Sequence, residues 1–198
     1  MSHIKSMPAI ILCALCALPA TLLYQPALST EDLMVFHRGN VAEPGSLDPH
    51  QSGGTWENNI IGELLMGLTT DDIAGQPIPG AAESWTISAD GLIWTFKLRN
   101  GSVWSDGIPV KASDFVFGIR RLLDPKTAAR YAFIAYVIKN AAAVNSGEMT
   151  KENLGVRAID DNTLEIILEE PTPFFPGLLT HYTTFPIPEH VVQKYGDD

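Results

Sequence analysis

Alternation of apolar and polar side chains predicts a β-hairpin near the middle of the chain. Residues 85–87 form a short apolar run, Asp90 and Gly91 follow as a tight-turn pair, and residues 93–98 alternate strictly. Because successive side chains of a strand point to opposite faces, one face of the second strand is predicted to be buried. The residues of that face are Trp94, Phe96 and Leu98.

A second hairpin is predicted further along the chain. Residues 156–159 and 163–168 are apolar-rich runs, and residues 160–162 between them are turn formers. The predicted inward face of the later strand consists of Leu164, Ile166 and Leu168. A shorter apolar run at 33–36 predicts a first strand, and the glycine- and proline-containing stretch 37–54 predicts a loop.

Apolar residues spaced three and four positions apart predict two helices. In the first, Trp56, Ile60 and Leu64 share one face, and Gly67 is predicted to cap the end. The second is predicted to begin at Ser113, a residue type that caps helix N-termini well. Its apolar stripe and its stop signal are Phe115, Ile119, Leu122, Asp124 and Pro125.

One more helix is predicted to begin at Pro188 and to end at Gly196. The predicted hairpins are clustered apart from the predicted helices, a pattern typical of α/β and α+β proteins. The sequence therefore predicts a mixed sheet with hairpins and flanking helices.

The first 29 residues have the pattern of a secretory signal peptide. Lys5 precedes an almost purely apolar stretch at 9–23, and Ala27 and Ser29 supply small residues for cleavage near Thr30. The apolar stretch is shorter than the roughly 20 residues that span a bilayer. A retained membrane anchor is the alternative interpretation. Cleavage predicts an exported, periplasmic protein with no stable membrane insertion.

The only two cysteines, Cys13 and Cys16, lie inside this apolar stretch. Their spacing resembles a redox or metal pair, but cleavage removes both, and no lipoprotein-type box precedes either one. The mature chain is therefore predicted to have no disulfide and to depend on packing alone, as a free periplasmic protein does.

The charge balance disfavours a nucleic-acid partner. The whole chain has a formal net charge of −10, and the part after residue 29 has 12 basic and 23 acidic residues. Nucleic-acid binders carry a basic face that neutralises phosphates, and anionic membrane surfaces repel an acidic chain. Neither partner is expected.

No catalytic or cofactor motif is recognisable in the chain. There is no nucleophile elbow, phosphate-binding loop or dinucleotide fingerprint, and the five histidines lack metal-ligand spacing. Paired acids stand at 71–72, 160–161 and 197–198, and each pair falls at a predicted turn, where Asp is a favoured residue. The sequence predicts no enzyme, no metal and no cofactor.

Four positions are candidates for ligand contact. Gly53 and Gly54 would let a ligand approach the backbone closely, although an ordinary flexible turn has the same composition. Trp56 could stack on a ligand or anchor its helix in the core. Tyr131 offers a hydroxyl on an apolar ring, and a surface packing role fits it equally well.

A run of short phrases resembles the family-5 extracellular solute-binding proteins, the oligopeptide- and dipeptide-binding group. The phrases extend from about residue 33 to the last residue, in order and at family-like spacing. They are EPGSLDPH at 43–50, GAAESW at 80–85, DGLIWTFKLR at 90–99, WSDG at 104–107, DFVF at 114–117, RRLLDPKTA at 120–128, LGV at 154–156, DDNTLE at 160–165 and PTPFF at 171–175. Those at 123–128 and 171–175 look most like the oligopeptide and murein-peptide binders.

This resemblance implies the N-terminal part of a two-lobed periplasmic-binding-protein fold of the class II type. A short peptide would lie in the cleft, held through its backbone like an added strand, and be passed to the permease subunits of an ABC importer. The ligand-lining residues implied for this chain are Gly53, Gly54, Thr55, Trp56 and Tyr131. Gly53 departs from the close oligopeptide binders, in which an acidic residue is common at this place.

Family members are much longer than 198 residues. We therefore expect residues 30–65 to begin a main lobe, residues 66–189 to form a mixed subdomain, and residues 190–198 to return to the main lobe. We also expect this chain by itself to bind peptides weakly or not at all. A non-binding remnant and a secreted enzyme are the alternatives, and nickel, haem and sugars are other ligands that the family takes.

Overall fold

The computed structural model describes residues 35 and 37–196 of the chain. The predicted signal peptide lies outside these described residues, as do three of the four residues of the predicted strand at 33–36. The architecture below concerns residues 39–196.

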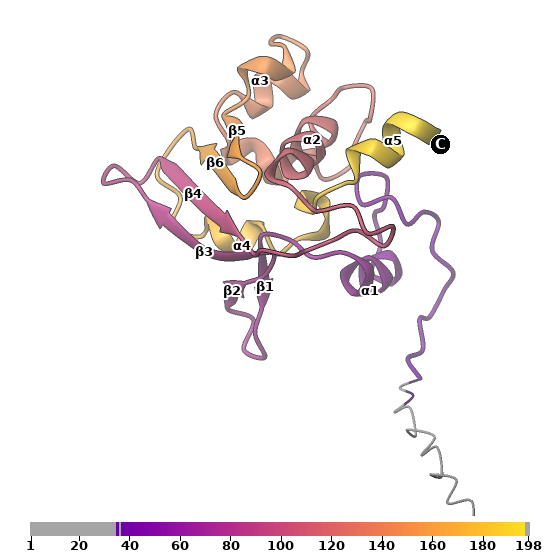
Figure 1. Ribbon diagram of the computed structural model, residues 1–198. Coiled ribbons are helices and arrows are strands. Elements are labelled where there is room, and N and C mark those ends of the chain that lie inside the picture. The colour runs from indigo at the N-terminus through magenta and orange to yellow at the C-terminus, as the bar shows by residue number, and fades with distance from the viewer. Residues whose placement is uncertain (1–34, 36, 197–198) are drawn as a thin grey trace, which may run out of the picture. The chain divides into compact units, whose positions relative to one another are not determined.

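Two hairpins join into one antiparallel sheet with the strand order β3-β4-β6-β5 (Figure 1). The strands are β3 (Ala82–Ile87), β4 (Ile93–Leu98), β5 (Val156–Asp160) and β6 (Thr163–Ile167). The inner strands β4 and β6 pair with each other, although their hairpins are far apart in sequence. Both predicted hairpins are confirmed, with Gly91 at φ +75° in the turn of the first.

The two faces of this sheet differ as the alternation predicts. Trp94, Phe96 and Leu98 are each at most 3% exposed, and Leu164 and Ile166 are fully buried. The outer face is mixed: Thr95, Lys97 and Glu165 lie there together with the paired Ile93 and Ile167. Arg157 forms an ion pair with Glu165 across the β5–β6 pair. An antiparallel sheet of this kind packs one face on the core and leaves the other to water.

Helix α2 (Ala112–Leu122) packs against β5 and β6 and closes the core. Its predicted stripe is confirmed, because Phe115, Ile119 and Leu122 are at most 1% exposed. The predicted start was wrong: the N-cap is Lys111, not Ser113. The Asp114 carboxylate accepts the Lys111 backbone N–H at 2.8 Å, so an acid in the first turn satisfies a backbone donor that a serine cap would not reach.

The remaining elements are short and surround the sheet and α2 (Figure 1). The last helix confirms its prediction: its N-cap is Pro188, and Gly196 ends it at φ +86°. These elements are α1 (Thr55–Leu64), β1 (Thr69–Asp71), β2 (Pro77–Pro79), η1 (Ala132–Val137), α3 (Ala141–Asn145), η2 (Lys151–Asn153), α4 (Phe175–Leu178), η3 (Tyr182–Thr184) and α5 (Glu189–Tyr195).

The sequence predicted that Gly67 caps the end of α1, and this prediction was wrong. The helix ends at Leu64, and Leu65 is already extended, with φ −126° and ψ 160°. A Cβ on Gly67 would lie 2.5 Å from the Leu179 carbonyl oxygen and 2.6 Å from the Phe185 ring. Glycine is required there because two other segments pack directly against the backbone.

Substituting Gly67 by alanine is expected to lower the free energy of unfolding by about 1–3 kcal/mol, since a backbone carbonyl must move aside. The matched control is Gly62→Ala in α1, where a Cβ would meet nothing within 4 Å. That control should raise stability by about 0.5–1 kcal/mol through its helix propensity. Urea unfolding of both variants measures the difference, and equal effects of the two would contradict this reading of Gly67.

Candidate ligand-binding site

Glu57, in the first turn of α1, is buried against the loop that precedes the helix. This side chain is 6% exposed, and its Oε1 accepts the backbone N–H of Gly45 at 3.0 Å. Hydrogen bonding from Gly45, above all, lowers the pKa of Glu57, so the carboxylate is charged at neutral pH. A negative charge in the first turn also suits the helix dipole. A Cβ on Gly54 would overlap Glu57 Oε2, which explains glycine at the N-cap.

Two tyrosines from distant parts of the chain hold the loop before α1. The hydroxyl of Tyr131 donates to the Gly53 carbonyl at 3.4 Å, and that of Tyr182 donates to the Ser52 carbonyl at 3.4 Å. The structure thus brings together Gly53 and Tyr131, two of the predicted site residues. Their role in binding a ligand stays a prediction.

An aromatic cluster surrounds Tyr131. The His181 ring stacks on Tyr182 with centroids 4.4 Å apart, and Tyr131 meets His181 edge-on at 5.1 Å. Tyr182 and Phe185 pack with Ile61 of α1 in a small second core. Burial, with smaller contributions from Tyr131 and the Glu57 charge, raises the pKa of Tyr182 to about 12, so its hydroxyl keeps its proton and remains a donor.

The other two predicted residues lie on the first turn of α1 and are exposed. Trp56 is 38% exposed, and its carbonyl accepts the side-chain amide of Asn40 at 3.1 Å. Its indole is thus partly accessible, and a role in stacking on a ligand stays a prediction. Thr55 precedes it and is also exposed. Together with Gly53 and Gly54 they form one continuous surface segment.

A buried ion pair anchors this loop to α2. The guanidinium of Arg121 donates to Asp48 Oδ1 at 3.0 Å and to Oδ2 at 2.7 Å, and it lies 3.0 Å from Nδ1 of His50. Arg121 is 9% and His50 1% exposed. Burial acts to raise the pKa of Asp48, but the hydrogen bonds from Arg121 and the His50 backbone outweigh it, so the pKa is lowered.

The ion pair between Arg121 and Asp48 lies a few residues before Gly53 and Gly54. Arg121 therefore fixes the position at which the exposed segment 53–56 begins. Sequence reasoning missed Arg121, Glu57, His181 and Tyr182. Arg121 stands in the phrase at 120–128, but nothing in that phrase names Asp48 as its partner. Glu57, His181 and Tyr182 stand in none of the quoted phrases, and His181 beside Tyr182 is the one local sign of an aromatic group there.

A cavity of about 720 Å³ lies beside the Arg121–Asp48 ion pair, between α2, β5 and α5, and Gln51 and Arg121 are among the residues that line it. Five basic side chains line it, but two of these, Arg121 and Arg157, are already paired with Asp48 and Glu165. Acidic side chains line it as well, so its charge is nearly balanced. Within residues 35 and 37–196, no group of three or more His, Cys, Asp or Glu is placed to hold a metal ion.

His181 gives the site a testable pH dependence. Burial lowers the pKa of this imidazole below its ordinary value of 6.5, so the unfolded chain takes up a proton more readily than the folded one. Stability is therefore complete above about pH 6.5 and falls as the pH drops below it. The change in unfolding free energy between pH 7 and pH 5, measured by urea titration, should be smaller in His181→Gln; an unchanged slope would contradict the assignment.

Comparison with known proteins places this fold. The sequence pattern of "Bacterial extracellular solute-binding proteins, family 5 Middle" matches residues 76–198. The chain belongs to this family. The resemblance that the short phrases carried is thereby confirmed, and members of the family are solute-binding proteins rather than enzymes.

Two curated relatives of this family-5 chain have different ligands in their names. The periplasmic oligopeptide-binding protein OppA of Salmonella typhimurium is 44% identical over 168 residues, which is 84% of this chain and 31% of OppA. A protein of Escherichia coli named "Probable deoxycholate-binding periplasmic protein YgiS" is also 44% identical, over 82% of this chain and 31% of its own length. The chain thus spans about a third of the length of either relative.

A solved structure has the same fold. Haemophilus influenzae OppA, in complex with the peptide RPPGFSPFR, superposes with a TM-score of 0.77 at 45% identity, over 80% of this chain and 31% of OppA. The described fold is therefore part of a periplasmic peptide-binding protein fold, with mixed α/β structure and antiparallel sheets. No helix among the described residues is long and apolar enough to cross a membrane.

Proposed function

We propose that this chain belongs to the periplasmic solute-binding component of an ABC importer and captures short peptides for uptake. The observation that carries the proposal is its likeness to OppA of H. influenzae, solved with a peptide bound. The deoxycholate-binding relative is equally similar, so identity alone does not choose the ligand. The described surface favours a peptide, because it offers backbone groups beside exposed rings.

The segment from Gly53 to Trp56 would make the first contacts. Gly53 and Gly54 leave the backbone open to a ligand chain, and the exposed Trp56 and half-buried Tyr131 provide rings against which peptide side chains pack. Recognition through backbone groups tolerates many side chains, because every peptide carries the same amides. No catalytic step and no cofactor are part of the proposal.

Export by the predicted signal peptide and delivery to the permease subunits complete the proposed role. The periplasmic location is supported by the names of the relatives. The boundaries at 65/66 and 189/190 remain proposals for where the lobes meet. Because the chain spans about a third of its relatives, the affinity of residues 30–198 alone is expected to be weak.

The test is a titration of ¹⁵N-labelled residues 30–198, followed by NMR, because amide shifts report even weak binding. A mixture of di- to pentapeptides is expected to shift the amides of residues 53–56 and 131, whereas sodium deoxycholate should not. If deoxycholate alone shifts these amides, the ligand is a bile acid and not a peptide. Absence of shifts with either would favour a non-binding remnant, and cleavage of the peptides would favour an enzyme.

A further inference from the structure

Arg130 occupies the space that a side chain on Gly53 would fill. A Cβ built on Gly53 would lie 2.9 Å from Nη1 of Arg130 and 3.1 Å from its Cδ and Cζ. A Cβ at residue 53 would therefore push the guanidinium away from the loop backbone, and glycine leaves it this place. Arg130 also directly precedes Tyr131, whose hydroxyl reaches the same Gly53 carbonyl.

The charge of Arg130 is exposed and has no ion-pair partner among the residues that the structure describes. The nearby acid, Glu57, is turned inward and held by the Gly45 backbone N–H. The two charges act in opposite directions on the Tyr182 hydroxyl, which places both within electrostatic reach of the same ring. Arg130 is thus the cation of the site that remains available to a ligand.

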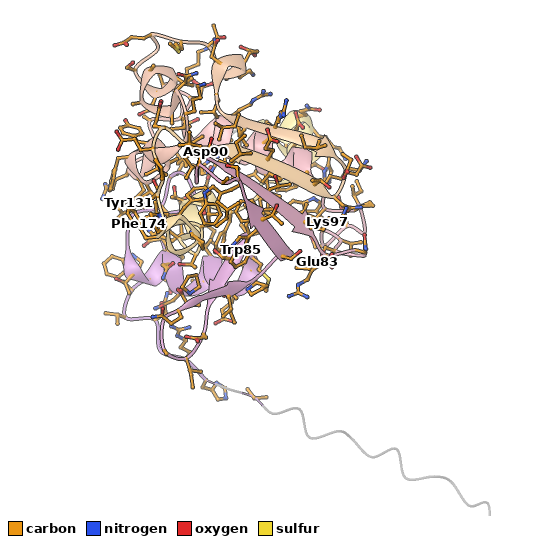
Figure 2. The ribbon with its side chains drawn as sticks, turned by 90° about the vertical axis from the view of Figure 1, so that its left-hand side faces the viewer. Glu83, Trp85, Asp90, Lys97, Tyr131 and Phe174 are labelled. Carbon is orange, nitrogen blue, oxygen red and sulfur yellow. The ribbon has the colours of Figure 1, made fainter. Side chains whose placement is uncertain are left out.

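Aromatic rings lie close to Arg130 in the chain and would therefore lie next to an anion bound there. Tyr131 and Phe133 have ring centroids 6.0 Å apart, and Phe133 is 59% exposed. Figure 2 shows Tyr131 on the opposite side of the view from Lys97 and Glu83, so the charged outer face of the sheet does not contribute to this site.

We propose that Arg130 makes the site select peptides that carry an acidic side chain. A guanidinium presents paired N–H donors that match both oxygens of a carboxylate. A glutamine amide or a lysine ammonium group in place of the arginine would not offer this pair of donors. The flanking rings favour apolar neighbours of the acidic residue. This inference rests on the proposed peptide function and adds the ligand chemistry to it.

The experiment compares three C-terminally amidated and N-terminally acetylated tripeptides, Ala-Glu-Ala, Ala-Gln-Ala and Ala-Lys-Ala, by ¹⁵N NMR titration of residues 30–198. The capped ends leave the central side chain as the only difference. The Glu peptide is expected to bind roughly fivefold more tightly than the Gln peptide, the size of a partly exposed ion pair, and the Lys peptide most weakly. This preference should shrink as salt is added.

Two variants assign the preference to the proposed geometry. Arg130→Gln removes the cation and should reduce the Glu/Gln ratio to about one. Gly53→Ala keeps the charge but pushes the guanidinium away from the loop backbone, and it should lower the ratio as well. The control is Arg157→Gln, an arginine on the outer face of the sheet, which should leave the ratio unchanged. Dispersed amide spectra confirm that each variant is folded.

The outcomes separate this inference from the proposed function. If the three peptides shift the amides of residues 53–56 with equal affinity, the peptide function stands and the role of Arg130 is overturned. The same holds if Arg130→Gln keeps the Glu preference. If the capped tripeptides shift no amide but the mixture of di- to pentapeptides does, this inference fails and the proposed function stands. If neither shifts any amide, both fail.

Discussion

Replacing Arg121 by methionine is expected to lower the free energy of unfolding by about 3–5 kcal/mol, because it leaves the Asp48 carboxylate without its partner in a largely buried place. Arg121 donates to both oxygens of Asp48 and also contacts His50, and it is itself 9% exposed. Methionine keeps most of the volume, so packing contributes little to the loss. Urea unfolding at pH 7, followed by circular dichroism, measures it.

The control for this prediction is Arg157→Met. Arg157 forms an ion pair with Glu165 at 2.8 Å, close to the 2.7 Å between Arg121 and Asp48, but its side chain is 66% exposed. Water screens such a pair, so the expected loss is below about 1 kcal/mol. Similar losses in the two variants would mean that burial does not govern the strength of the Arg121 contact.

Phe96→Ala is the second substitution with a large expected effect, a loss of about 3–5 kcal/mol of unfolding free energy. Phe96 is fully buried on β4, and its ring centroid lies 6.1 Å from that of Trp85 and 6.3 Å from those of Trp94 and Phe175. Removing it opens a cavity where the sheet, α2 and α4 meet. The thermal midpoint should fall by about 6–20 °C.

Phe174→Ala is the matched control, since Phe174 directly precedes the buried Phe175 but is 65% exposed. Figure 2 shows Phe174 at the periphery of the molecule. Its loss should change the unfolding free energy by less than about 0.5 kcal/mol. Calorimetry of both variants provides the comparison, and a small effect of Phe96→Ala would show that the neighbouring rings collapse into the gap.

The elements that local periodicity encodes were predicted well. The alternation at 93–98 predicted the buried face of β4, and the three-four spacing from Phe115 to Leu122 predicted the inner face of α2. Each of these patterns arises because one side of an element faces apolar neighbours, whichever segment provides them. The family resemblance could be found for a similar reason, since its phrases are contiguous.

Contacts between distant segments could not be predicted in this way. Gly67 is glycine because Leu179 and Phe185 pack on its backbone, and no local rule names those partners. Lys111, not Ser113, precedes α2 because the Asp114 carboxylate provides the bond that the local rule assigned to a hydroxyl. Likewise, nothing near Asp48 in the sequence indicates Arg121.

The sequence therefore predicted only part of the site. Gly53, Gly54, Thr55 and Trp56 could be named together because they are neighbours in the chain. Their partners Arg130 and Tyr182 reach the loop through the tertiary fold, and His181 packs on Tyr131 and Tyr182.

The hydrogen bond from Tyr182 to Ser52 has a consequence for how the chain folds. It joins residues 130 positions apart, and closing a loop of that length costs about 4 kcal/mol of chain entropy. The hairpins and α2 require much shorter closures, so they can form while the two sides of the binding loop are still apart. We therefore expect the Tyr182–Ser52 contact, and with it the loop, to become ordered after the hairpins and α2.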